Sequence, residues 1–138
     1  LRALRDAGHA PRPALMTTGE MTAAYGYAQA RALLAGPEAP TAFLCAATMI
    51  ATGVRQAIEE RGLVLGRDVS VLTFDDDLSY YANRDAVPVF SAMRSPVRVA
   101  GARCAALLID RITGGPGDPV QELLEAELVV GRSTAPPA

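Results

Sequence analysis

The sequence predicts a three-layer α/β protein in which helices cover a parallel sheet, and three observations support this prediction. Short apolar runs alternate with segments of helical periodicity, and Gly, Pro and polar residues separate them. Such alternation with short loops is typical of a parallel sheet covered by helices. The chain has 138 residues, of which half are apolar and a fifth charged, so it is long enough for one core.

The elements follow from periodicity, capping residues and helix-breaking residues. Residues 1–8 have the pattern of a helix that Gly8 ends, so we expect the chain to begin inside an element and to continue a longer protein. The predicted order is a helix at 1–8, a strand at 14–16, a helix from the Thr17–Glu20 capping box to Ala35, a strand at 41–46, a helix at 48–61, a strand at 69–74, a short helical or irregular piece at 78–84, a strand at 89–93, a helix that Ser95 caps and that runs to Ile112, and strands at 121–124 and 127–132.

Charge and composition argue against several classes of protein. All 13 basic residues are Arg, and with 15 acidic residues the net charge is −2, so this piece has no basic surface for nucleic acid. No run approaches the roughly 18 apolar residues of a membrane span. Cys45 and Cys104 each lie in an apolar run, so we expect two buried, reduced thiols.

Right-handed connections between parallel strands place three loops at one edge of the sheet, where the strands end. These loops open at Thr17, at Ala47–Thr48 and at Asp75. Open α/β sheets bind ligands at this carboxyl edge, so the topology predicts a binding crevice there. Thr48 has two interpretations, because its hydroxyl can cap the following helix or can share that helix N-terminus with a ligand.

The run Asp75–Asp77 directly follows a buried strand, and neighbouring carboxylates repel one another. One interpretation is a turn in which one Asp caps the next segment. A second is a metal site like that of receiver domains, although the chain has no Lys to complete it. A third is a ligand site, since an ionised carboxylate accepts two hydroxyl donors, as sugars require.

Enzymatic interpretations have little support in the sequence. His9 is the only histidine and lies in a Pro-flanked loop, which disfavours a Ser-His-Asp or Cys-His arrangement. The glycines of 114–117 lack the Lys-Ser/Thr of a phosphate-binding loop, so they form a turn. The chain also has neither a CxxC motif nor metal-ligand spacing. We therefore expect no catalysis, no cofactor and no metal.

Several motifs occur in an order that resembles the lactose-repressor (LacI/GalR) family of transcription regulators. The matching segments are Ala3–Gly8, Gly26–Leu34 with the pattern Gly-Tyr-x-Ala-x-x-x-Leu-Leu, Pro40–Ala46, Gly66–Asp76 with the pattern Asp-Val-Ser-Val-x-x-Phe-Asp-Asp, and Glu127–Pro137. Together they extend over nearly the whole chain.

The resemblance implies the C-terminal lobe of an effector-binding domain, a Rossmann-like lobe of the periplasmic-binding-protein-like type I fold. It further implies that 1–94 and 118–138 form the lobe, while 95–117 is a helix that packs on an N-terminal lobe absent from this chain. Operator DNA would be bound through a helix-turn-helix that is also absent. A homodimer or a domain-swapped oligomer is expected, because the stripe of that helix would otherwise lack a partner surface.

The same resemblance identifies the candidate ligand-binding residues. They are Asp75, Thr48, Ala47 and Met21. Asp75 matches the polar contact of the family, and we expect it to be the main one. Ala47–Thr48 replaces the Asn-Asp pair of the family, and Met21 replaces an aromatic residue that often packs on a sugar ring. The Arg of the family that contacts the effector would precede Leu1.

Three functions remain open from the sequence. The first is the sensor module of a cytoplasmic repressor that binds a small, carbohydrate-like effector. The second is a periplasmic solute-binding protein of the same fold, which a signal peptide in the gene would indicate. The third is a small α/β receiver domain or hydrolase that uses the Asp75–Asp77 carboxylates, and metal-dependent turnover would indicate it.

Overall fold

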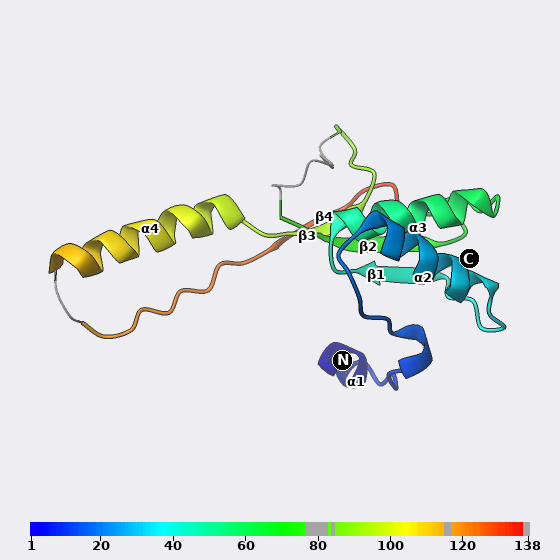
Figure 1. Cartoon of the computed structure of the whole chain (residues 1–138), viewed down its shortest axis with the longest axis horizontal. Coiled ribbons are helices and arrows are strands. Elements are labelled where there is room, and N and C mark those ends of the chain that lie inside the picture. Colours follow the sequence, from blue (N-terminus) through cyan, green and yellow to red (C-terminus); the bar gives the residue numbers. More distant parts are fainter. Residues whose placement is uncertain (77–82, 84, 115–116, 137–138) are drawn as a thin grey trace.

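The structure is a computed structural model that describes residues 1–76, 83, 85–114 and 117–136 (Figure 1). Its elements are α1 (Arg2–Asp6), the 3-10 helix η1 (Pro13–Leu15), α2 (Ala23–Ala35), β1 (Ala42–Cys45), α3 (Thr48–Glu60), β2 (Ser70–Asp75), β3 (Ser91–Arg94), α4 (Val97–Gly114) and β4 (Glu127–Val129). The predicted alternation of strands and helices is present from α2 to β2, and no helix lies between β2 and β3 among the described residues.

One sheet organises the fold, with the strand order β1-β2-β3-β4. β1, β2 and β3 are parallel, and their register places Cys45 beside Thr73 and Asp75 beside Arg94. β4 pairs with β3 in the antiparallel direction, because residues 117–126 lead the chain back along the path of α4 to the sheet. The predicted α/β class with a mostly parallel sheet is confirmed.

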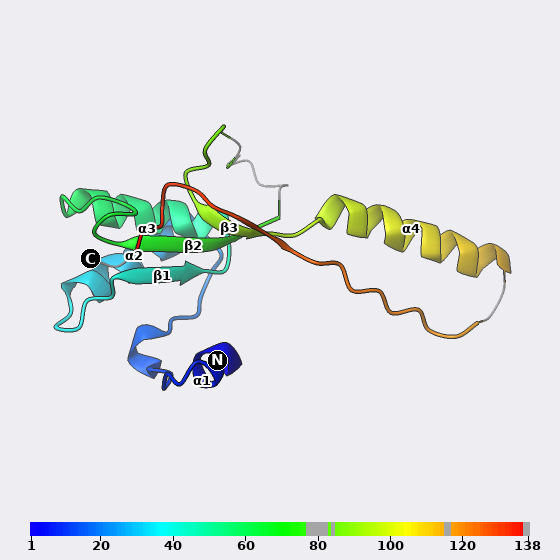
Figure 2. The same cartoon turned by 180° about the vertical axis from the view of Figure 1, so that it is seen from behind.

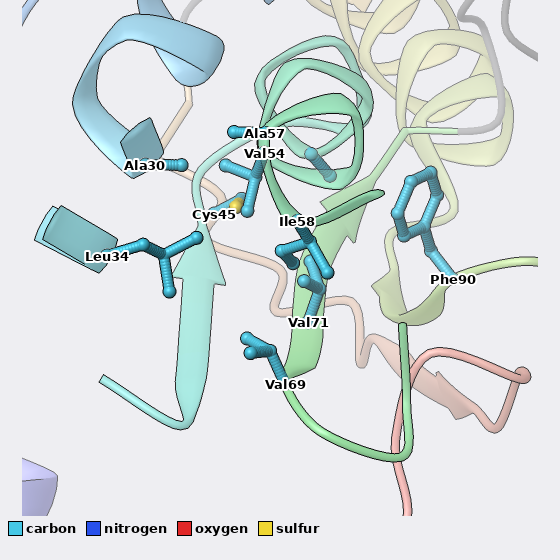
Figure 3. Packing of buried hydrophobic residues seen from close by; sticks show 10 residues of the cluster. Ala30, Leu34, Cys45, Val54, Ala57, Ile58, Val69, Val71 and Phe90 are labelled. Atoms are coloured by element: carbon cyan, nitrogen blue, oxygen red, sulfur yellow. The ribbon is translucent and has the colours of Figure 1, made fainter. Parts of the chain in front are cut away.

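Helices α2 and α3 form a layer on one face of the sheet, and in Figure 2 both lie behind β1 and β2. Inward-facing residues alternate along the strands, so that β2 directs Val71 and Thr73 toward α3. Between these layers lies the core, in which Val54, Ile58 and Val71 meet at the centre, with Phe90 on one side (Figure 3). Leu44 and Phe74 point to the opposite face, where their side chains are 81% and 43% exposed.

Two glycines allow α2 and α3 to approach each other closely. A Cβ atom on Gly26 would lie 2.2 Å from the carbonyl oxygen of Ile50 in the other helix. A Cβ atom on Gly53 would lie 1.9 Å from the carbonyl oxygen of Ala23. Because these neighbours are backbone atoms, they cannot move aside without shifting a whole helix. The two glycines therefore determine how deeply α2 sits on α3.

The C-terminal segment after β4 is held by hydrogen bonds from buried hydroxyl groups. Ser133 is fully buried; its Oγ donates to the carbonyl oxygen of Val71 and accepts from the amide of Ser91. The amide of Val71 in turn donates to the carbonyl oxygen of Ser133, at 2.8 Å. Ser91 Oγ accepts from the Gly131 amide, at 2.9 Å. The segment thus extends the hydrogen bonding of β2 and β3 near their amino ends.

α4 extends away from the sheet, with residues 117–126 returning beside it (Figures 1 and 2). None of its residues is buried, and Leu108, Ile109 and Ile112 are each more than half exposed. Arg103 in α4 forms an ion pair with Glu122 of the returning segment. We call α4 together with residues 117–126 the arm. Its apolar side chains make no core within the part of the chain that the structure describes.

Four predicted features differ from the structure. The apolar run 14–16 lies in and beside η1 rather than in a strand, because Pro13 begins a 3-10 turn. α2 is capped by Thr22, whose Oγ1 accepts from the amide of Tyr25, so the Thr17–Glu20 capping box is wrong. Residues 121–124 are extended without a partner strand. Cys104 is exposed because α4 leaves the lobe, whereas Cys45 is buried as predicted.

The other strand and helix boundaries agree to within about two residues of those predicted, the last strand being shorter than 127–132. The first of the three loops predicted at the carboxyl edge, at Thr17, does not follow a strand. The irregular piece predicted at 78–84 lies outside the described residues, except for Asn83.

Replacing Gly53 by Ala is expected to lower the free energy of unfolding by roughly 2 kcal/mol or more, since the added methyl group overlaps backbone atoms. The matched control is Gly101→Ala in the exposed α4, where a Cβ atom meets no neighbour within 4 Å. That change should raise helix stability by about 0.5–1 kcal/mol. Urea denaturation of both variants measures the difference. Equal stability of Gly53→Ala and wild type would contradict the close approach of α2 and α3.

Candidate functional site

The carboxyl edge of the sheet gathers the ends of β1, β2 and β3. Ala47 is the N-cap of α3 and Thr48 is its first residue, directly after the end of β1. The Thr48 hydroxyl donates to the carbonyl oxygen of Phe74 in β2, at 3.4 Å, and makes no capping bond. The predicted capping role of Thr48 is therefore wrong. Instead, the buried hydroxyl connects the start of α3 to the residue before Asp75.

Asp75 ends β2 and is only 3% exposed. Its Oδ2 atom lies 3.4 Å from Nη2 of Arg94, the last residue of β3. Neighbouring residues in register share a face of the sheet, so the parallel pairing of Asp75 with Arg94 brings the two charges together. Burial of a carboxylate is tolerated where a cation compensates the charge, and Arg94 supplies that cation.

Arg94 has a second contact through the same atom. Nη2 also donates to the carbonyl oxygen of Asn83, at 3.2 Å. Asn83 is itself fixed by two bonds to the backbone of Phe90, one donated by Nδ2 and one accepted by Oδ1. The Arg94 Nε–H group is buried and has no hydrogen-bond partner among the described residues. A donor of this kind loses its hydration without gaining an acceptor, which is unfavourable.

A cavity of about 350 Å³ opens beside this ion pair, where β3 leads into α4. Its described lining residues are Asp76, Arg94–Val99, Glu125 and Glu127. The size is at the lower end of the range of small-molecule sites, which is about 300–1,000 Å³. The lining combines carboxylate and guanidinium residues with the apolar Pro96, Val97 and Val99, and its exposed surface is mostly apolar. It can therefore hold a small molecule that carries several hydroxyl groups.

The structure brings together some of the residues that the sequence predicted and not others. Thr48 lies beside the end of β2, one residue from Asp75, and Ala47 precedes it. Met21 precedes α2, and its side chain is 63% exposed. None of these four is among the described residues that line the cavity. Asp77 lies outside the described residues, so the carboxylate run is described only for Asp75 and Asp76.

Sequence reasoning missed Arg94 and Asn83. The signal for Arg94 was available, because a charged residue closes the apolar strand at 91–94 just before the Ser95–Pro96 helix start. Knowing that it pairs with Asp75, 19 positions earlier, requires the register of two separate strands, which no local pattern contains. Asn83 lies in a segment without hydrophobic periodicity.

Other kinds of site find no support in the part of the chain that the structure describes. No group of three or more His, Cys, Asp or Glu residues there has the geometry of a metal site. His9 is exposed after α1. No described helix is both long enough and apolar enough to cross a bilayer.

The fold and the site define the class of protein to which the chain belongs. Residues 1–134 match the family model of the periplasmic binding protein-like domain, and the chain is a member of that family. Within it, the homologues are LacI-type transcriptional regulators. The resemblance seen in the sequence motifs is thereby confirmed, and a solute-binding protein of the periplasm is not favoured.

Individual relatives support this placement. The chain is 38% identical to the HTH-type transcriptional regulator AglR of Rhizobium meliloti, over 99% of the chain and 38% of that protein. The cellobiose complex of the transcriptional regulator CelR is 30% identical, with a TM-score of 0.81 over 96% of the chain and 39% of CelR. The lactose repressor bound to the anti-inducer ONPF is 28% identical, with a TM-score of 0.80 over 97% of the chain and 48% of that structure. The chain thus spans less than half the length of these relatives.

The difference in burial between Cys45 and Cys104 provides a test of the fold around the site. Burial raises the pKa of the Cys45 thiol from 9.0 to about 11, whereas Cys104 is exposed on α4. In dilute solution at pH 8, a thiolate-specific reagent should label Cys104 rapidly and Cys45 only after denaturation. Cys104→Ser should abolish the rapid phase.

The same shift predicts how stability depends on pH. Since the folded chain keeps the Cys45 proton at a pH where the unfolded chain loses it, the stability should fall as pH rises from about 9 toward 11. In the labelling experiment described above, rapid labelling of both thiols in the folded chain would contradict the burial of Cys45 under α3.

Proposed function

We propose that the chain is the effector-sensing part of a LacI-type transcriptional regulator, without catalytic activity. The observation that carries this proposal is the cavity at the carboxyl edge of the sheet, with charged acceptors and donors in its wall. Ligand binding at this edge is the rule for open α/β sheets. The homologous regulators are not enzymes, and DNA binding would belong to a part of the protein outside this chain. A regulator of transcription in a bacterium works in the cytoplasm.

The proposed effector is a small molecule rich in hydroxyl groups. Two features support this choice, namely the mixed donor and acceptor lining of the cavity and the cellobiose bound to the related CelR. We propose that binding depends on Asp75, with Ala47, Thr48 and Met21 at the border of the site. A receiver domain or hydrolase has less support, because the homologues are transcriptional regulators.

We further propose that residues 1–94 and 118–138 form one lobe and that 95–117 packs on a second lobe outside this chain. The exposed arm supports this division. Helices in proteins are stabilised mostly by tertiary packing, and the 18-residue α4 has no buried side chain in this chain. The cavity lies between the sheet and the arm. A second lobe seated on the arm would therefore also close the ligand site.

The first test replaces Asp75 by Ala in the full-length regulator. A panel of glucose, maltose, cellobiose and sucrose is titrated by calorimetry, and the sugar that binds most tightly is kept. Asp75→Ala should weaken its binding about tenfold or more, equivalent to roughly 1–3 kcal/mol for a lost charged acceptor. The matched control is Glu38→Ala, an exposed carboxylate before β1. Unchanged affinity in a folded Asp75→Ala protein would contradict the assignment.

The second test concerns the arm of the isolated 138-residue chain. Leaving a large apolar side chain in water forgoes about 1.5–3 kcal/mol, so the arm should associate with a second copy by pairing or swapping. Light scattering should show a dimer or a larger species. Leu108→Glu combined with Ile112→Glu should shift the chain toward the monomer. A monodisperse wild-type monomer at high concentration would contradict this expectation.

A further inference from the structure

We draw no further inference here: the strongest candidate, a polar cavity of about 310 Å³ between α2 and the end of α3, carries nothing, because its charged residues Arg31, Glu60 and Arg61 are exposed and nothing in the described part of the structure shows what it would hold.

Discussion

The parallel pairing of β2 with β3 is the constraint on which most of this structure depends. Its register, Leu72 to Asp75 against Ser91 to Arg94, places opposite charges side by side at one end. At the other end, the same two strands receive the C-terminal segment through Ser133. The amide of Ser95 donates to the carbonyl oxygen of Asp75, at 3.0 Å, and so ties the start of the arm to the end of β2. A shift of register by one residue would therefore disturb the site, the tail and the arm together.

The parts of the fold that could be predicted are those with a strong local signal. β1, α3 and β2 each have continuous apolar runs or helical periodicity, bounded by Gly or polar residues. Predictions failed where two signals of similar strength compete. Thr17 and Thr22 are both able to cap α2, and in the structure Thr22 does so by accepting from the amide of Tyr25. Similarly, the strand predicted at 121–124 has only Leu123 and Leu124 as apolar residues, and these four residues are not in a strand.

The candidate site was predictable to a smaller extent. The position of Asp75 follows from topology alone, because any residue that ends a central parallel strand lies at the binding edge. Its burial and its ionic partner do not follow, since they depend on the register with β3 and on Asn83. The exposure of Cys104 was missed for a related reason. The sequence pattern of an apolar stripe is the same whether the surface that it packs on lies in the same lobe or outside the chain, so the pattern alone could not show that Cys104 is exposed.

The polar chemistry of the carboxyl edge is concentrated on β2 and β3 rather than on the corner between β1 and α3. Ala47 has no polar side-chain atom, and the Thr48 hydroxyl is bonded to Phe74. That corner therefore offers a ligand mainly the backbone amides at the start of α3. The charged side chains come instead from the ends of β2 and β3 and from the start of the arm. The amide of Ser95 links these elements, so the end of β2, the end of β3 and the start of α4 meet at the wall of the cavity.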